Sequence, residues 1–221
     1  MNFVEALRRG EVRSLAVFGD SITVGLNASA PSEAWPALLA KAANIPVVRN
    51  RAISGTILQG GAMANGWPRP DNGVGRYREA LLGEDGAEAL AILYGYNDGR
   101  YTAAPATLNA QAFRRDYAEM LAGLLERGFA AGSIAIGSPP CPSERGFGVG
   151  SAGFAGQTRA GFERYVEAAR SLAAEFGVYY APVYEAMRVY GEGELMSDDV
   201  THPNDAGHAV IGAAFRLAMR A

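Results

Sequence analysis

The chain has 221 residues, of which 49% are apolar and 19% charged, and its formal net charge is -3. This size and composition suit one α/β domain with a sizeable core, so we expect a single domain over residues 1–221. The slight negative charge gives no reason to expect a nucleic-acid partner, and the single cysteine, Cys141, excludes an intrachain disulfide and a multi-cysteine metal site.

Short apolar runs alternate with amphipathic stretches along the chain, which is typical of a parallel sheet covered by helices. The predicted strands are residues 14–18, 46–49, 89–94, 133–136 and 177–180. The predicted helices are residues 32–43, 74–82, 109–127, 154–175 and 203–220. The helix over 109–127 has the clearest 3.6-residue period, with Gly128 at its C-terminal end, and Pro203 suits the first turn of the last helix.

The first strand runs into Gly19-Asp20-Ser21, so Ser21 lies where a strand gives way to a loop. The connections after the strands 14–18, 89–94 and 133–136 are long and rich in Gly, Pro, Asn and Ser. In open α/β sheets, ligands bind at such loops, beyond the carboxyl ends of the strands. The sequence therefore predicts a site that includes Ser21.

A second motif, Asp199-Val200-Thr201-His202, comes just before the last predicted helix. The chain has two histidines, and His208 lies inside that helix, whereas His202 can reach out from a loop. Alone, an Asp three residues before a His could cap a helix, and Gly-Asp-Ser could form a turn. Together, Ser21, His202 and Asp199 are the three groups that make a hydroxyl nucleophilic at neutral pH.

Two residues after neighbouring strands are candidates for an oxyanion hole. Asn97 follows the third strand and can present an amide donor, whereas Gly55 follows the second strand and can offer an N–H with no side chain in the way. Each could also be an ordinary turn residue. Their position at the ends of successive strands predicts that they converge on Ser21.

These segments resemble the sequence blocks of a known family. Phe18–Thr23, Gly55, Gly95–Asp98 and Asp199–Asn204 are similar, in this order, to the blocks of the SGNH hydrolases, the GDSL esterase/lipase family, and Trp35-Pro36 also sits where many members have this pair. The resemblance spans nearly the whole chain. It implies a flavodoxin-like three-layer α/β/α sandwich with a central parallel five-stranded sheet and a shallow, open site.

The residues and the resemblance together predict an esterase that forms an acyl-enzyme on Ser21, with His202 as base, Asp199 as acid, and an oxyanion hole from Ser21, Gly55 and Asn97. No metal or organic cofactor is expected, and the expected partner is a small-molecule ester. The loops 60–75 and 138–156 lack a long apolar stripe, which favours a short acyl group. A carbohydrate O-deacetylase, an acyl-thioesterase or lysophospholipase, and a catalytically silent binding module remain alternatives.

Other patterns carry less weight. Gly148–Gly153 matches a dinucleotide-binding glycine pattern but lies far from the nearest strand, so we expect a loop. The spacing of His202 and His208 does not favour a shared metal, and Cys141 lacks a free histidine to activate it. No apolar run is long enough to span a bilayer and the start of the chain lacks a signal core, so the expected location is the cytoplasm unless a signal segment was removed.

Overall fold

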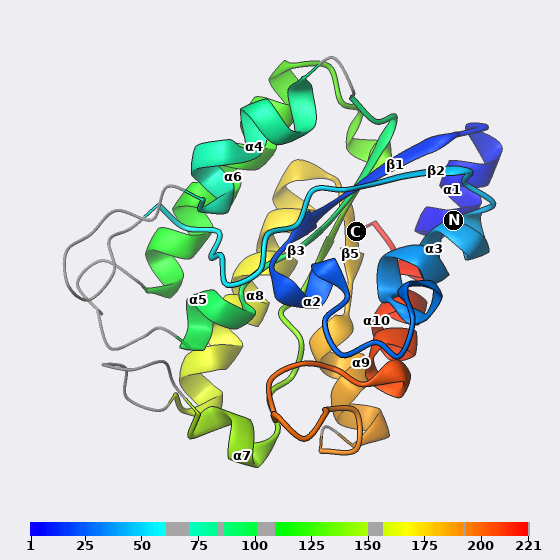
Figure 1. Ribbon diagram of the computed structural model, residues 1–221. Helices are drawn as coiled ribbons and strands as arrows, with labels where there is room; N and C mark the ends of the chain where they lie inside the picture. The colour runs from blue at the N-terminus through cyan, green and yellow to red at the C-terminus, as the bar shows by residue number, and fades with distance from the viewer. Residues whose placement is uncertain (61–70, 84–85, 101–108, 150–156, 192, 221) are drawn as a thin grey trace.

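The computed structural model describes residues 1–60, 71–83, 86–100, 109–149, 157–191 and 193–220 (Figure 1). Five parallel strands form one sheet in the order β2-β1-β3-β4-β5. They are β1 (Ser14–Gly19), β2 (Val47–Asn50), β3 (Ala89–Leu93), β4 (Ile134–Gly137) and β5 (Tyr179–Ala181). Each lies within two residues of its predicted range. The apolar runs of β1, β3 and β4 are buried and stand out in the sequence, whereas the edge strand β2 is largely exposed.

Helices cover both faces of the sheet (Figure 1). One layer holds α1 (Phe3–Arg9), α3 (Trp35–Ala43), α9 (Val183–Tyr190) and α10 (Asp205–Arg216), and the other holds α4 (Gly73–Leu82), α6 (Ala110–Glu126) and α8 (Arg159–Phe176). In β1, Leu15 and Val17 belong to one buried cluster whereas Ala16 and Phe18 belong to the other. This alternation confirms the predicted three-layer α/β/α fold.

The structure corrects several predicted elements. Helix α10 begins at Asp205 and is capped by the side chain of Asn204, so Pro203 lies before the helix and not in its first turn. The long connection expected after the third strand begins with the short helix α5 (Tyr96–Arg100), which contains Asn97. The predicted start of the helix over 154–175 falls partly outside the described residues, and α8 itself is capped by Thr158.

Further differences from the predicted elements concern short helices. Helices α1 and α9 were not predicted, and the start of the helix predicted over 32–43 is a 3₁₀ turn, Pro31–Glu33, ahead of α3. Two more short helices lie at the carboxyl ends of strands or beyond them: α2 (Ser21–Val24) follows β1, and α7 (Glu144–Phe147) lies after β4. Among the described residues, no helix is long and apolar enough to cross a membrane.

The strand order reverses between β1 and β3, because the chain leaves β1 toward β2 at one edge and later adds β3, β4 and β5 on the other side. In open α/β sheets, ligands bind at such a reversal, beyond the carboxyl ends of the two central strands. Ser21 follows β1 and Asn97 follows β3, so both residues lie at this end of the sheet.

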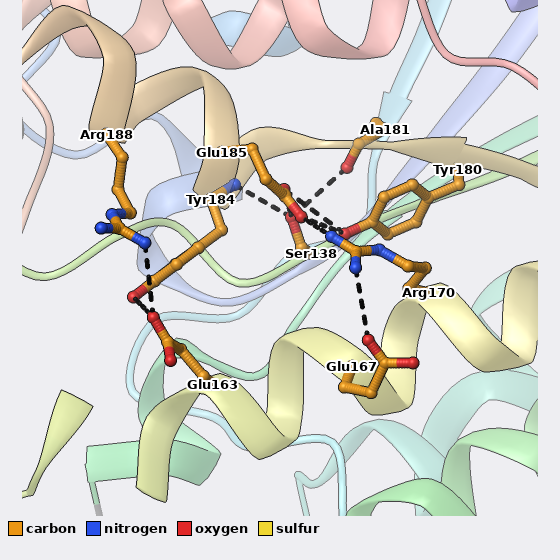
Figure 2. Close-up of polar contacts among 9 residues, drawn as sticks. All are labelled: Ser138, Glu163, Glu167, Arg170, Tyr180, Ala181, Tyr184, Glu185 and Arg188. Atoms are coloured by element: carbon orange, nitrogen blue, oxygen red, sulfur yellow. Dashed lines mark hydrogen bonds and ion pairs between the residues drawn. The ribbon is translucent and has the colours of Figure 1, made fainter. Parts of the chain in front are cut away.

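A polar network holds α8 against β5 and α9 (Figure 2). The Glu185 carboxylate accepts hydrogen bonds from Tyr180 Oη at 3.2 Å and Ser138 Oγ at 3.4 Å, and it forms an ion pair with Arg170 of α8. Two turns earlier on α8, Glu163 accepts a hydrogen bond from the Tyr184 hydroxyl of α9 at 2.9 Å. These groups satisfy one another, so the network has a structural role.

Candidate active site

Ser21 is the first residue of α2, and the chain around it is tightly constrained. The Asp20 side chain caps the helix by accepting a hydrogen bond from the Ile22 N–H at 3.0 Å. A Cβ added to Gly19 would lie 2.2 Å from Thr23 Oγ1 and 2.4 Å from the Leu93 carbonyl oxygen, so only glycine allows this close packing. The serine is buried at 7% exposure and has a fixed direction.

The side chains of Ser21, His202 and Asp199 form a continuous hydrogen-bonded chain. Ser21 Oγ lies 2.8 Å from His202 Nε2, and His202 Nδ1 lies 2.6 Å from Asp199 Oδ2. With the proton of the neutral imidazole on Nδ1, this nitrogen donates to the carboxylate, and Nε2 accepts from the serine hydroxyl. The structure thus brings together the three residues that the sequence singled out, although 178 residues separate Ser21 from Asp199 (199 minus 21).

The turn from Asp199 to His202 places the Asp199 carboxylate against the His202 ring, whose other nitrogen faces Ser21. Asp199 Oδ1 accepts hydrogen bonds from the N–H groups of Thr201 and His202, both at 2.9 Å. Burial alone would raise the pKa of Asp199, but these N–H groups and the His202 ring lower it to about 2. Asp199 therefore stays ionised over the whole neutral range.

The same turn stores backbone strain. Val200 has a φ of 55°, which is a strained conformation for a β-branched residue. Two backbone hydrogen bonds hold the turn, from the Val200 N–H to the Ser197 carbonyl at 2.9 Å and from the Ser197 N–H to the His202 carbonyl at 2.8 Å. Strain that is held in this way is typical of positions where function fixes the geometry.

The expected oxyanion donors besides Ser21 are Gly55 and Asn97, of which Asn97 contacts Asp20, the residue before Ser21. Gly55 sits in an exposed turn with a φ of 78°, which suits glycine, and a Cβ there would meet no atom within 4 Å. Among the described residues, the N–H groups of Ser21 and Gly55 have no hydrogen-bond acceptor. Asn97 Nδ2 lies 3.0 Å from the Thr56 carbonyl oxygen and 3.4 Å from Asp20 Oδ2, so its second hydrogen has only a long contact in this structure.

Two buried carboxyl groups support these donors. Asp98 accepts hydrogen bonds from the N–H groups of Leu58 and Gln59 at 3.0 to 3.1 Å, which anchors the chain that follows Gly55. Burial raises the pKa of Asp98 to about 6 against the effect of these hydrogen bonds. Burial likewise raises the pKa of Asp20 to about 7; the Ile22 N–H opposes this rise and the charge of Asp98 adds to it.

The second histidine, His208, is a core residue of α10. Its Nε2 donates to the Leu26 carbonyl oxygen at 3.1 Å, and its Nδ1 lies 3.5 Å from the Trp35 backbone nitrogen. Burial lowers the pKa of His208, so the ring is neutral in the folded protein. His208 therefore fastens the segment after α2 to α10 and does not reach Ser21.

This environment predicts a pH-dependent contribution to stability. The unfolded chain takes up a proton on His208 below a pH of about 6.5, whereas the folded protein resists it, so the contribution is present above this pH and falls as the pH is lowered. We expect the Tm of the wild type, relative to that of His208→Gln, to fall when the pH is lowered from about 8 to about 5. Thermal melts of both proteins test this, and a constant difference in Tm would contradict it.

One contact of the site was not predicted from the sequence. Asn27 Nδ2 donates to Asp199 Oδ2 at 2.9 Å, from the segment that follows α2. Asn27 has a φ of 64°, which asparagine tolerates better than most residues, but nothing in the local sequence points from this turn to a residue 172 positions later.

The other sequence patterns considered above were a shared metal, a reactive Cys141 and a glycine-rich nucleotide loop. In the part of the chain that the structure describes, no group of three or more His, Cys, Asp or Glu side chains could hold a metal ion. Cys141 is fully buried. Most of the glycine pattern over 148–153, and most of the loops 60–75 and 138–156 that we expect to select the substrate, lie outside the described residues or form parts of α4 and α7.

Comparisons with known proteins identify the family and the fold. The sequence model of the GDSL-like lipase/acylhydrolase family matches residues 17–210. A search of curated proteins found no match. Among solved structures, the chain is similar to a lipase/acylhydrolase from Enterococcus faecalis, with a TM-score of 0.69, 22% identity and coverage of 91% of this chain and 92% of that chain.

Two further solved structures show the same similarity. TesA aligns with a TM-score of 0.64, 20% identity and coverage of 91% of this chain and 94% of that chain. The psychrotrophic esterase EstA from Pseudoalteromonas sp., inhibited by monoethylphosphonate, aligns with a TM-score of 0.61, 16% identity and coverage of 91% and 93%. At these identities the similarity establishes the fold.

Proposed function

The chain belongs to the GDSL-like lipase/acylhydrolase family, a family of ester-hydrolysing enzymes, and we propose that it is a serine esterase that acts through an acyl-enzyme on Ser21. The observation that carries this proposal is the hydrogen-bonded chain from Ser21 Oγ through His202 to Asp199, with contacts of 2.8 Å and 2.6 Å. A structural serine has no need of an imidazole in this orientation, and the arrangement is the one that activates a hydroxyl for acyl transfer.

The first half of the reaction forms the acyl-enzyme. His202 Nε2 takes the proton of Ser21 as Oγ attacks the ester carbonyl carbon, and the carbonyl oxygen becomes an oxyanion. The ionised Asp199 stabilises the imidazolium that forms and keeps the remaining proton on Nδ1. As the tetrahedral intermediate collapses, the bond to the alkoxy oxygen breaks, and Nε2 protonates the departing alcohol.

The second half repeats these steps with water. His202 takes a proton from a water molecule, whose oxygen attacks the acyl carbon. Collapse of the second tetrahedral intermediate breaks the bond to Ser21 Oγ, which recovers its proton from Nε2, and the carboxylic acid leaves. Both intermediates carry a negative oxygen that the N–H groups of Ser21 and Gly55 and the amide of Asn97 can stabilise.

Asn97→Ala should lower kcat by about 10²–10³-fold with little change in KM, because the amide donates more strongly to the oxyanion than to the ground-state carbonyl. The change also leaves the Thr56 carbonyl without its donor, so stability should be measured alongside steady-state kinetics. Asn2→Ala is a suitable control, since it removes the cap of α1 without touching the site. An effect on KM alone would place Asn97 in ground-state binding.

For the substrate, we propose an ester with a short acyl group. Val24 and Ile53 are each 41% exposed; Val24 lies at the end of α2, and the Ile53 N–H bonds to the Gly19 carbonyl at 3.1 Å, two residues before Ser21. We infer that these two exposed apolar side chains, close to Ser21 along the chain and through this backbone bond, form a small apolar surface for the acyl group.

A panel of p-nitrophenyl esters of rising acyl length, run beside acetylated xylose and acetylated glucosamine, tests this assignment. We expect kcat/KM to be highest for the acetate and butyrate esters and to fall for longer chains. A maximum at decanoate or beyond would contradict the short-acyl assignment and favour a lysophospholipase. A much higher kcat/KM for the acetylated sugars would instead identify a carbohydrate O-deacetylase.

A further inference from the structure

We propose that Asn27 is a positioning residue of the active site, whose side-chain amide holds the Asp199 carboxylate in the orientation that His202 requires. The proposal rests on the proposed function, in which Asp199 orients the base. It adds the Asn27 amide, from a distant part of the sequence, to the hydrogen-bonded series Asp199–His202–Ser21.

The first support is the set of donors around the Asp199 carboxylate. Oδ1 accepts from two backbone N–H groups at 2.9 Å, and Oδ2 accepts from His202 Nδ1 at 2.6 Å. Asn27 Nδ2 supplies the second donor to Oδ2 at 2.9 Å. Each oxygen of the carboxylate therefore has two donors, which is the full complement for its lone pairs. Without Asn27, the imidazole would be the one remaining donor to Oδ2 among the described residues.

The second support is that the backbone around Asn27 is fastened near His202. Asp205 accepts two hydrogen bonds from Ser29, from the N–H at 2.8 Å and from Oγ at 2.6 Å, and His208 donates to the Leu26 carbonyl. Asp205 and His208 lie on α10, whose first residue comes three positions after His202. The segment on either side of Asn27 is thus tied to the helix that follows the base, so Asn27 and His202 are held relative to the same element.

The chemistry gives Asn27 two effects on the reaction. A donor on Oδ2 fixes the plane of the carboxylate, and therefore the direction of the hydrogen bond to Nδ1. It also shares the negative charge of Oδ2, so its removal should make the carboxylate stabilise the imidazolium more strongly. The expected signature has two parts. The value of kcat falls, and the acidic limb of the plot of kcat/KM against pH moves to higher pH.

The charges that surround the imidazole are left in place by this test. Asp199 on the same turn and His208 on α10 act on the imidazole directly. The groups one step further away are Asp205 beside His208, the Tyr96 hydroxyl near Asp199, and Asp20 and Arg100 near Tyr96. A shift of the acidic limb on substitution of Asn27 therefore reports the missing amide.

Asn27→Gly tests the proposal because glycine keeps the φ of 64° without strain and removes only the amide. We expect kcat to fall by about tenfold and the acidic limb to rise by roughly half a pH unit, with Tm little changed since Asn27 is exposed. Asn27→Asp, which places a second carboxylate against Oδ2, should move the limb further in the same direction. Asn44→Gly is the matched control, since Asn44 is also exposed and has a φ of 59°, but it ends α3 away from the triad.

The outcomes separate this proposal from the proposed function. A pH profile and kcat equal to those of the wild type in Asn27→Gly would overturn the role of Asn27 while leaving the esterase mechanism intact. Equal changes in Asn27→Gly and Asn44→Gly would overturn it as well, because the effect would then be one of general stability. Activity that survives in Ser21→Ala would instead overturn the proposed function.

Discussion

Ser21→Ala should abolish ester hydrolysis and leave the protein folded. The substitution removes the atom that attacks the ester and the proton that His202 takes, so the acyl-enzyme cannot form. Loss of the nucleophile in a serine hydrolase costs about 10⁶-fold in kcat, and we expect a loss of several orders of magnitude here. Steady-state assays with p-nitrophenyl acetate, corrected for the uncatalysed rate, measure the effect.

Ser171→Ala provides the control for this experiment. Ser171 lies on α8 and donates to the Ala168 carbonyl of its own helix, so its loss should leave kcat unchanged. Circular dichroism and Tm of both variants establish that each is folded. If Ser21→Ala kept even a tenth of the wild-type turnover, Ser21 could not be the nucleophile.

Asp199→Asn should slow turnover by up to about 10⁴-fold, because it favours the wrong tautomer of the base. The two backbone N–H groups on Oδ1 and the Asn27 amide all require an acceptor. The new side chain has one oxygen, and if that oxygen takes the place of Oδ1, its NH₂ group faces His202 Nδ1. The imidazole then accepts at Nδ1 and carries its proton on Nε2, where it cannot take the proton of Ser21.

Asp198→Asn is the matched control, since it makes the same change at the preceding residue. Asp198 is exposed and has no hydrogen bond or ion pair with any other described residue, so kcat should stay within a few-fold of the wild type. Kinetics of the two variants under the same conditions decide between the carboxylates. Greater damage in the Asp198 variant would show that the acid of the triad is wrongly assigned.

The sheet and the long helices could be predicted from the sequence because their signals are local. The apolar run of β3, Ala89–Leu93, is fully buried, and α6 has an apolar face that repeats every 3.6 residues. Helix α9 has eight residues, too few for a clear period, and its stability comes from burial of Val183, Tyr184 and Met187 against the core. Helix α1 does have a local signal in the sequence, the capping box between Asn2 and Glu5.

The residues of the site likewise fall into those that a local signal identifies and those that depend on distant contacts. Ser21, Asp199 and His202 could be identified because each occurs in a short motif, and the fold that the strand pattern predicted brings the carboxyl ends of β1 and β3 together. Asn27 could not be identified, since its importance depends on a contact across the molecule and not on its neighbours in the sequence. Pro203 was misplaced because Asn204 is a stronger helix cap, accepting from the Gly207 N–H.

The central claim is that Ser21 becomes covalently bonded to the acyl group, and titration with an organophosphate tests it most directly. Diethyl p-nitrophenyl phosphate, added in slight excess, should release one equivalent of p-nitrophenol per chain, and intact-mass and peptide analysis should place the phosphoryl group on Ser21. Ser21→Ala should take up none, and hydrolysis of p-nitrophenyl acetate should fall in proportion to labelling. A protein that hydrolyses esters while remaining unlabelled, or that is labelled at another residue, would contradict the mechanism.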